Sequence, residues 1–305
     1  MDVSRPGAVG LESRGVLRVS GPDARPFLQG MVSNDVDKLT AERALWAAFL
    51  TPQGKFLHDL FLVQAPAQDG GGEAILLDCE AARRDDLKRR LGIYKLRAKA
   101  TIEDATADYR VAILFGDGAL SALGLPAEAG RAAPLAGGIA YVDPRLPALG
   151  ARAILPAATA EAALAEAGFA AADLAAYDAL RIGLGVPDGS RDLEVEKALL
   201  LENGFDELHG IDWEKGCYVG QELTARTKYR GLVKKRLLPV DIDGPQPPPD
   251  TPIMLAGKEA GVLRSAVDNV GLALLRVEHL DAAPPDVLTA GEARLTPRKP
   301  AWAAF

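Results

Sequence analysis

The chain has 305 residues, of which 48% are hydrophobic and 25% charged, and its formal net charge is −7 at pH 7. The length predicts about two domains with room for a sizeable core, and the acidic balance argues against general binding of a nucleic-acid backbone. The two cysteines are too few for a secreted disulfide framework, and no CxxC or Cys/His cluster indicates a metal site.

The sequence also suggests where the protein works. Residues 1–15 contain charge and glycine but no apolar run, which predicts no secretory signal peptide. The longest apolar runs, such as 111–115, are far too short to cross a bilayer. We therefore expect a cytoplasmic protein in a reducing compartment, without membrane association and without a stably bound metal.

The first half of the chain alternates short apolar runs with helical segments. Strands are expected at 16–20, 44–50, 55–64, 74–78, 97–104 and 109–116, with helices at 23–30 and 81–92. A tight turn with Pro52 and Gly54 joins two of the strands, and a glycine-rich hairpin loop covers 67–73. Gly92 is expected to close the second helix.

The second half begins with helices and ends in strands. We expect a helix and a loop over 118–138, two more strands, and two helices over 157–184 with Gly168 between them. The segment 244–252 contains five prolines and predicts a linker or a rigid loop. The short apolar runs after it predict a small antiparallel β-domain, with a barrel as one form of it.

Cys217 lies in the stretch EKGCYVGQELTARTKYRG at 214–231. An unperturbed thiol has a pKa of about 8.5, and a nearby Lys215 or the amides of a helix that starts near Gly220 favour its anion. The alternative is a small buried side chain in a turn, with Tyr218 and Val219 as core. These residues alone leave both interpretations open.

Longer segments around Cys217 resemble a known family. RIGLGVPDGSRDL, followed by LLLENGFDELHGIDWEKGCYVGQELTARTKYRGLVKKRL, closely resembles the folate-binding YgfZ family, whose signature is the run K-G-C-Y-x-G-Q-E. GPDARPFLQGMVSNDV and LTPQGKFLHDL extend the resemblance over most of the chain. It is weakest from about 118 to 170 and after 244.

The YgfZ family is similar to the glycine-cleavage T-protein, an aminomethyltransferase, and this resemblance implies the fold. It implies an α+β ring of two ferredoxin-like modules and a small C-terminal antiparallel β-barrel around a folate-sized cavity. The first module is expected at 1–46 and 145–240 and contains the signature, the second at 47–144, and the barrel at 241–305.

The resemblance also implies a function. The family acts in biogenesis or maintenance of iron–sulfur enzymes, including enzymes that modify tRNA, so we expect iron–sulfur client or assembly proteins as partners. The cofactor implied is tetrahydrofolate or a derivative. The family's functional cysteine falls on Cys217, beside Lys215, and we expect Tyr218, Gln221 and Glu222 to contact the folate.

Further folate contacts are expected outside the signature, each with a plainer alternative. Asn34 and Asp35 fall where the family places polar cavity residues, but they also suit an Asx turn. Asp59 faces either the cavity or the solvent. Arg226 and Arg230 could bind the glutamate tail of a folate as carboxylate forks, or they could be solvated surface charges.

Two departures from T-proteins argue against aminomethyl transfer. Those enzymes contain a pair of aspartates where this chain has His58 and Asp59, and a glutamate where it has Gly183. We therefore favour a folate-binding assembly factor. A folate-dependent aminomethyl or one-carbon transferase is the alternative, and a thiol-based redox protein is a third possibility.

Overall fold

The structure is a computed structural model that describes residues 6–66, 73–279 and 287–305. The chain forms two compact units. Unit 1 comprises Met1–Leu50, His58–Asp173 and His209–Val219, and unit 2 comprises Thr51–Leu57, Leu174–Leu208 and Gly220–Phe305. The expected glycine-rich loop at 67–73 lies almost entirely outside the described residues. In the described part of the chain, no helix has the length and apolar character needed to cross a membrane.

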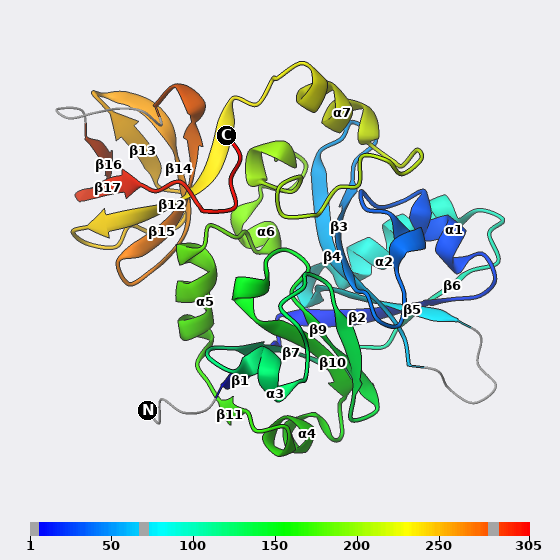
Figure 1. Ribbon diagram of the computed structural model, residues 1–305. Helices are drawn as coiled ribbons and strands as arrows, with labels where there is room; N and C mark the ends of the chain where they lie inside the picture. Colours follow the sequence, from blue (N-terminus) through cyan, green and yellow to red (C-terminus); the bar gives the residue numbers. More distant parts are fainter. Residues whose placement is uncertain (1–5, 67–72, 280–286) are drawn as a thin grey trace. The chain divides into compact units, whose positions relative to one another are not determined.

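One sheet of unit 1 contains five strands in the order β3-β4-β5-β2-β6 (Figure 1). The strands are β2 (Arg14–Ser20), β3 (Leu45–Leu50), β4 (Phe56–Gln64), β5 (Ala74–Glu80) and β6 (Thr101–Asp104). The helices α1 (Ala24–Gln29) and α2 (Arg84–Lys95) pack against them. Every residue of β3 is buried, so this strand belongs to the core on both faces.

The other sheet of unit 1 has six strands in the order β11-β1-β7-β10-β9-β8. They are β1 (Gly7–Gly10), β7 (Tyr109–Phe115), β8 (Ala132–Leu135), β9 (Gly138–Val142), β10 (Ala151–Pro156) and β11 (Ala170–Ala171). The helices α3 (Ala119–Ala122) and α4 (Ala160–Glu166) contribute Ala119, Ala160 and Ala163 to an apolar cluster with this sheet. Small side chains let the helices approach the strands closely.

Buried ion pairs connect the two sheets of unit 1. Asp78 on β5 accepts hydrogen bonds from Arg14 on β2 at 2.6 Å and from Arg152 on β10 at 2.6 Å. All three side chains are almost completely buried. The guanidinium of Arg152 also lies 4.0 Å from the ring centre of Phe61. The core between the sheets is therefore charged and aromatic as well as aliphatic.

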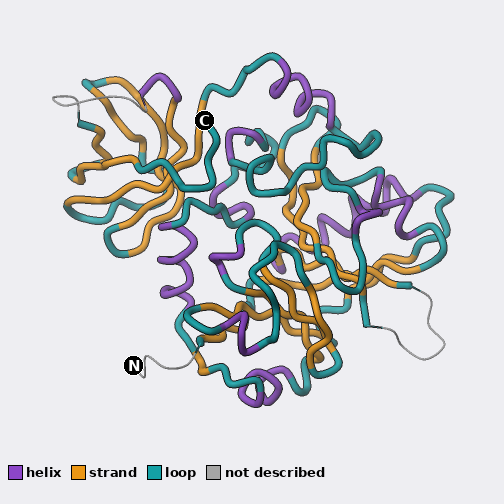
Figure 2. The backbone as a smooth tube through the Cα atoms, viewed as in Figure 1, coloured by secondary structure: helices purple, strands orange, loops and turns teal. Residues whose placement is uncertain are grey.

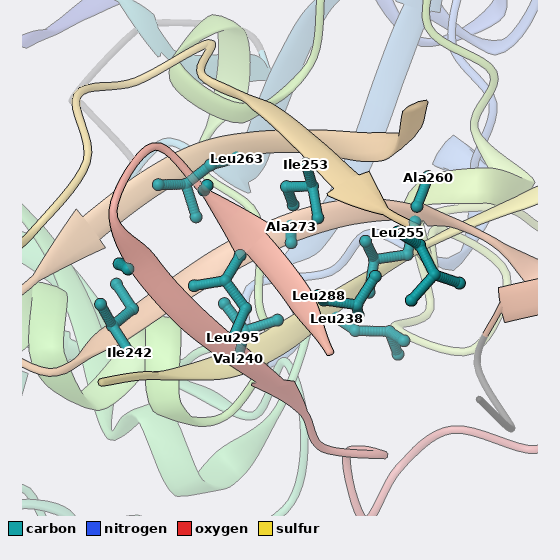
Figure 3. Close-up of a cluster of buried hydrophobic side chains, with 13 residues drawn as sticks. Leu238, Val240, Ile242, Ile253, Leu255, Ala260, Leu263, Ala273, Leu288 and Leu295 are labelled. Carbon is teal, nitrogen blue, oxygen red and sulfur yellow. The ribbon is translucent and has the colours of Figure 1, made fainter. Parts of the chain in front are cut away.

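Unit 2 contains a closed barrel in the order β12-β15-β14-β13-β16-β17. Its strands are β12 (Lys235–Asp243), β13 (Pro252–Leu255), β14 (Lys258–Val267), β15 (Val270–Arg276), β16 (Leu288–Ala290) and β17 (Ala293–Pro297). Alternate residues point inward and form an apolar interior (Figure 3). Each of these described strands pairs with a neighbour on both sides, so the sheet closes on itself.

Two helices of unit 2, α5 (Leu174–Gly183) and α6 (Gly189–Asp192), pack against the outer surface of the barrel. The third, α7 (Gln221–Tyr229), contacts the 3₁₀ segment Leu201–Asn203, and Figure 2 shows these helices as short purple segments. Ile182 of α5 packs against Leu237, Leu272 and Leu274. Between α5 and α6, the buried Arg181 donates to Asp192 at 2.7 Å.

The two sheets and the closed barrel confirm the expected α+β class with a C-terminal barrel. The barrel begins at Lys235 rather than at 241, and the proline-rich segment is a loop between β12 and β13, not a linker. The helix expected to end at Gly92 continues to Lys95, because Gly92 is exposed and nothing there requires a turn.

The expected module borders are wrong, because strand pairing crosses them. β2 was expected in the first module, yet it pairs with β5 and β6 of the second. Within the expected second module, β7 pairs with β1 and β10, which were both assigned to the first. Each sheet therefore takes strands from both predicted modules.

Candidate functional site

The turn that contains Cys217 returns the chain to unit 1 after a long excursion. Residues 209–219 pack against the segment that follows α1, and the backbone N–H of Val219 donates to the carbonyl of Gly30 at 3.1 Å. The thiol of Cys217 is free and exposed. Of the two interpretations that the sequence left open, the structure therefore supports an accessible thiol and contradicts a buried one.

Lys215 anchors this turn. Its Nζ donates to the carbonyls of Gln29 at 2.8 Å, Val32 at 2.6 Å and Asn34 at 2.6 Å. An ammonium group has three protons, and here each has an acceptor near the end of α1. Lys215 therefore holds this turn in position, and all three of its Nζ protons are engaged by carbonyl oxygens.

Burial and nearby carboxylates have opposite effects on the pKa of Lys215. Burial lowers the pKa of Lys215 to about 8, while the carboxylates of Asp35 and Asp212 favour the charged form and limit that shift. The ammonium also lies 5.1 Å from the ring centre of Tyr218, which is itself nearly buried. Tyr218 therefore packs beneath the turn as core, whereas the neighbouring Cys217 is exposed to the solvent.

The side chains of Asn34 and Asp35 are both engaged in hydrogen bonds within unit 1. The side-chain amide of Asn34 donates to the carbonyls of Trp46 and His209, both at 2.7 Å, and its oxygen accepts from the N–H of Asp35. Asp35 accepts from Gln29 at 2.8 Å and begins a short 3₁₀ helix. Asp35 also accepts from the N–H of Asp37 and so forms the Asx turn of the plainer alternative, whereas the amide of Asn34 bridges two distant carbonyls.

A cavity of about 330 Å³ nevertheless lies beside Asn34. Its lining combines apolar, charged and amide side chains, all of them from unit 1: Asn34, Lys38, Arg43, Ala44, Leu45, Trp46, Glu128, Ala129, Pro144, His209, Ile211 and Asp212. Lys38 and Asp212 form an ion pair across it. The guanidinium of Arg43 has no hydrogen-bond or ionic partner among the residues that the structure describes.

Asp59 faces neither this cavity nor the solvent. It is buried, with one oxygen 3.3 Å from the Arg14 guanidinium and the other accepting from the indole N–H of Trp46 at 3.3 Å. Trp46 lines the cavity, and Asp59, which was predicted to contact folate, is absent from the lining and bonds to the Trp46 indole instead.

The neighbouring His58 is also engaged internally. Its Nε2 lies 3.1 Å from Asp86 of α2, and the ring is almost fully buried. Burial, reinforced by Arg83, lowers the pKa of His58 to about 4, so the ring is neutral at pH 7. Neither member of the His58–Asp59 pair is thus presented to a ligand in the cavity.

The signature crosses the border between the two units, because unit 1 ends at Val219. Gly220 precedes α7 with a φ of 82°, a conformation that favours glycine. Within unit 2, Gly54 approaches it so closely that an added Cβ would lie 2.6 Å from the Gly220 carbonyl oxygen. The predicted Pro52–Gly54 turn therefore packs against the start of α7.

The remaining predicted folate contacts lie on α7. Glu222 and Arg226 form an exposed ion pair with each other at 2.5 Å, one helical turn apart. Arg230 ends the helix and is exposed, and Gln221 begins it. These four residues, like Tyr218, are absent from the cavity lining, so only Asn34 of the predicted contacts lies there.

Several cavity residues were missed from the sequence. Trp46 was assigned to a core strand, and Lys38, Arg43 and Asp212 received no role. Asp212 does lie inside the segment that resembles the family, five positions before Cys217. Its distance from Lys38 along the chain, 174 positions, hides their pairing from any local pattern.

Comparisons with known proteins agree with this architecture. The family model described as "CAF17, C-terminal beta-barrel domain" matches residues 234–305, which contain the whole barrel. The glycine cleavage system aminomethyltransferase T from Bartonella henselae superposes with a TM-score of 0.76 at 17% identity, over 98% of this chain and 86% of that one. This structural similarity shows the fold alone, and it confirms the T-protein-like architecture.

Sequence relatives are more informative about the family. The chain is 36% identical to the human "Iron-sulfur cluster assembly factor IBA57, mitochondrial", over 88% of this chain and 77% of the relative. It is 34% identical to the Mycosarcoma maydis homolog of that factor, over 88% of this chain and 73% of the relative. The resemblance to YgfZ is thus confirmed at the broader level of iron–sulfur assembly factors with a T-protein fold.

The same relatives overturn one expectation. They are mitochondrial proteins by name, so the prediction of a cytoplasmic location, which rested on the absence of an apolar leader, is contradicted. Their identity and coverage are high enough to show the relationship. The chain belongs to the family of the iron–sulfur cluster assembly factor IBA57.

Proposed function

We propose that this protein assists the assembly or maintenance of iron–sulfur enzymes through the thiol of Cys217, and that it binds a tetrahydrofolate in the cavity of unit 1. The observation behind the first part is an exposed cysteine on a turn that Lys215 fixes through three carbonyl hydrogen bonds. A fixed, accessible thiolate is a suitable metal ligand.

A single thiol limits what the protein does with iron. Clusters normally take several thiolates, and no group of three or more metal-binding side chains occurs among the described residues. Iron or a cluster is therefore cargo, shared briefly with a partner that supplies the other ligands. Clients that modify tRNA, as in the YgfZ family, belong to this proposal.

The cavity supports the folate part of the proposal. Its volume, about 330 Å³, is at the lower end for small-molecule sites and suits the bicyclic end of a folate better than the whole molecule. Trp46 offers an aromatic wall for that ring, and the unpaired guanidinium of Arg43 can donate hydrogen bonds to the ring's carbonyl oxygen. Tetrahydrofolate, when bound, would supply one-carbon chemistry that the chain's own side chains lack.

Aminomethyl transfer receives no such support. The T-protein similarity at 17% identity concerns the fold. His58 is neutral and bonded to Asp86, and Asp59 is bonded to Arg14 and Trp46, so this pair offers no free carboxylate to a folate. We therefore expect folate binding without aminomethyl turnover.

The thiol role is tested in a strain that lacks this protein. Cys217→Ala should fail to restore the activity of [4Fe–4S] enzymes, whereas Cys79→Ala should restore it. Cys79 is the matched control because it is buried and its burial raises the thiol pKa to about 12, which makes it inert at neutral pH. Full activity with Cys217→Ala would exclude the thiol from the function.

The folate part is tested separately with purified protein and tetrahydrofolate, by calorimetry. Arg43→Gln should weaken binding about tenfold, as expected for loss of a charge-assisted hydrogen bond, while Arg226→Gln on α7 should bind normally. No binding by the unaltered protein would reject the folate and leave the thiol role standing. Turnover of an aminomethyl donor would instead favour the transferase.

A further inference from the structure

The C-terminal end of α2 presents large apolar side chains to the solvent. Ile93 is 59% exposed and Leu96 is 85% exposed. Ile93 lies in the last turn of α2 and Leu96 directly follows the helix, so both side chains belong to its C-terminal end. An added Cβ on the adjacent Gly92 would meet nothing within 4 Å, which shows that this face is open.

Unpaired cations surround these apolar side chains. Lys95, Arg97 and Lys99 have no hydrogen-bond or ionic partner for their charged groups among the described residues. Earlier in the same helix, by contrast, Arg89 and Arg90 both pair with Asp86. We call Ile93, Lys95, Leu96, Arg97 and Lys99 the α2 tip. In a chain with net charge −7, it is a local concentration of positive charge.

The stability of the fold does not explain why a leucine occupies position 96. Its backbone has a φ of 45° and a ψ of −108°, a conformation that glycine adopts freely and a leucine adopts at a cost in stability. At 85% exposure the side chain gains almost nothing from packing in return. The tip is held in place from below, where Tyr94 meets Phe49 edge to face at 6.2 Å.

We infer that the α2 tip docks this protein on an anionic phospholipid surface. Ile93 and Leu96 enter the boundary between headgroups and acyl chains, and Lys95, Arg97 and Lys99 contact the lipid phosphates. Apolar side chains with flanking lysines and arginines are the pattern of interfacial binding. The attachment is peripheral and reversible, and it replaces the earlier expectation that the protein has no membrane association.

A protein partner fits the same surface less well. A stable protein interface covers roughly 800 Å² on each side around a central apolar anchor. The tip offers only two apolar side chains at a helix end, and none of its residues lines a described cavity. A lipid surface needs no matching shape, so a small convex tip with several cations is enough.

Vesicle flotation with the full chain tests this inference. The protein should float with vesicles of phosphatidylcholine and phosphatidylglycerol, remain unbound with phosphatidylcholine alone, and dissociate as salt is added. The triple variant Lys95→Gln, Arg97→Gln, Lys99→Gln should bind about a hundredfold more weakly, at about fivefold for each cation. Lys258→Gln, an exposed barrel lysine, should bind normally.

Leu96→Gly separates docking from folding. Glycine suits the backbone at this position, so the melting temperature should stay the same or rise. Binding to the anionic vesicles should nevertheless fall about tenfold, because the inserted side chain is lost. Leu232→Ser removes another exposed leucine, in unit 2, and should leave binding intact.

Two results would overturn the inference. One is no binding, or equal binding to both kinds of vesicle, which would leave a protein as the occupant of the tip. The other is normal binding by the triple variant and by Leu96→Gly, which would place any lipid contact elsewhere on the chain.

Discussion

The barrel of unit 2 and the interior of unit 1 contain opposite chemistry. The main core cluster of the barrel is composed of 13 apolar side chains (Figure 3). Between the sheets of unit 1, buried carboxylates meet buried guanidiniums: Asp59, Asp78 and Asp143 with Arg14, Arg145 and Arg152. Phe61 packs among the arginines, with its ring centre 4.0 Å from Arg152 and 4.9 Å from Arg145.

This difference predicts two responses to mutation. An apolar core loses stability in proportion to the volume removed, and it tolerates swaps of similar size. A buried ionic network is stable only while every charge has a partner, because an uncompensated charge in a poorly polarisable interior is costly. The stability of unit 1 therefore depends on keeping each charged side chain of its polar core, whereas the stability of the barrel depends mainly on the volume of its apolar side chains.

The largest effect should come from breaking the ionic network. Asp78→Asn leaves Arg14 and Arg152 without their shared carboxylate and should lower the free energy of unfolding by about 3–5 kcal/mol in urea titrations. Asp241→Asn is the control, because Asp241 pairs with Arg298 on the exposed surface and should matter by less than about 1 kcal/mol. If Asp78→Asn and Asp241→Asn lower the free energy of unfolding equally, the buried network is no more sensitive than a surface ion pair.

A slightly smaller effect is expected in the barrel. Leu263→Ala should cost about 3 kcal/mol because it opens a cavity in the apolar cluster. Leu263→Met keeps the volume and should cost less than about 1.5 kcal/mol. If the methionine variant is as unstable as the alanine variant in the same urea titrations, the barrel is not governed by volume.

The next effect is a dependence of the free energy of unfolding on pH, and it should arise in unit 1 from His58. The folded pKa of His58 is about 4, below the ordinary value of 6.5, so between these values the unfolded chain binds a proton that the folded chain does not. Stability from this source is complete above pH 6.5 and is lost as the pH falls toward 4, by about 2–3 kcal/mol. His58→Leu should flatten that part of the stability profile, and an unchanged profile would contradict it.

The smallest effect should arise on α7. The exposed Glu222–Arg226 pair is expected to contribute less than about 0.5 kcal/mol, as solvent screens it. Arg226→Gln should therefore leave the urea midpoint almost unchanged. A loss comparable to that of Leu263→Ala would mean that α7 is held by more than its own surface charges.

Local patterns were enough to predict most of the elements. Alternating apolar residues and turn signals identified the barrel strands, and the TPQG turn before β4 was correctly placed. The prediction of the borders between modules failed, because those borders depend on which strands pair, and the paired strands lie far apart in the sequence. Nothing local in the sequence of β2 shows that its partners are β5 and β6.

The sequence indicated only part of the candidate site, because contacts between distant segments leave no local pattern. The exposed Cys217 agrees with the functional interpretation of the signature. The anchoring role of Lys215 could not be read from the signature, because its acceptors lie 181 to 186 positions earlier in the chain. Asp59 was misjudged because a charged residue in a strand normally indicates a polar face, whereas here Arg14 compensates it in the core.

The long sequence separation between Lys215 and its acceptors determines when the Cys217 turn can form during synthesis. The turn with Cys217 is the last segment of unit 1 to leave the ribosome, and its anchor lies at and just after the end of α1, the first helix of the described residues. Contacts this distant in sequence form late, because closing so large a loop costs entropy first. The exposed thiol of Cys217 therefore reaches its final geometry only after the rest of unit 1 has been made, so a chain that ends before residue 209 lacks the turn and its anchor contacts.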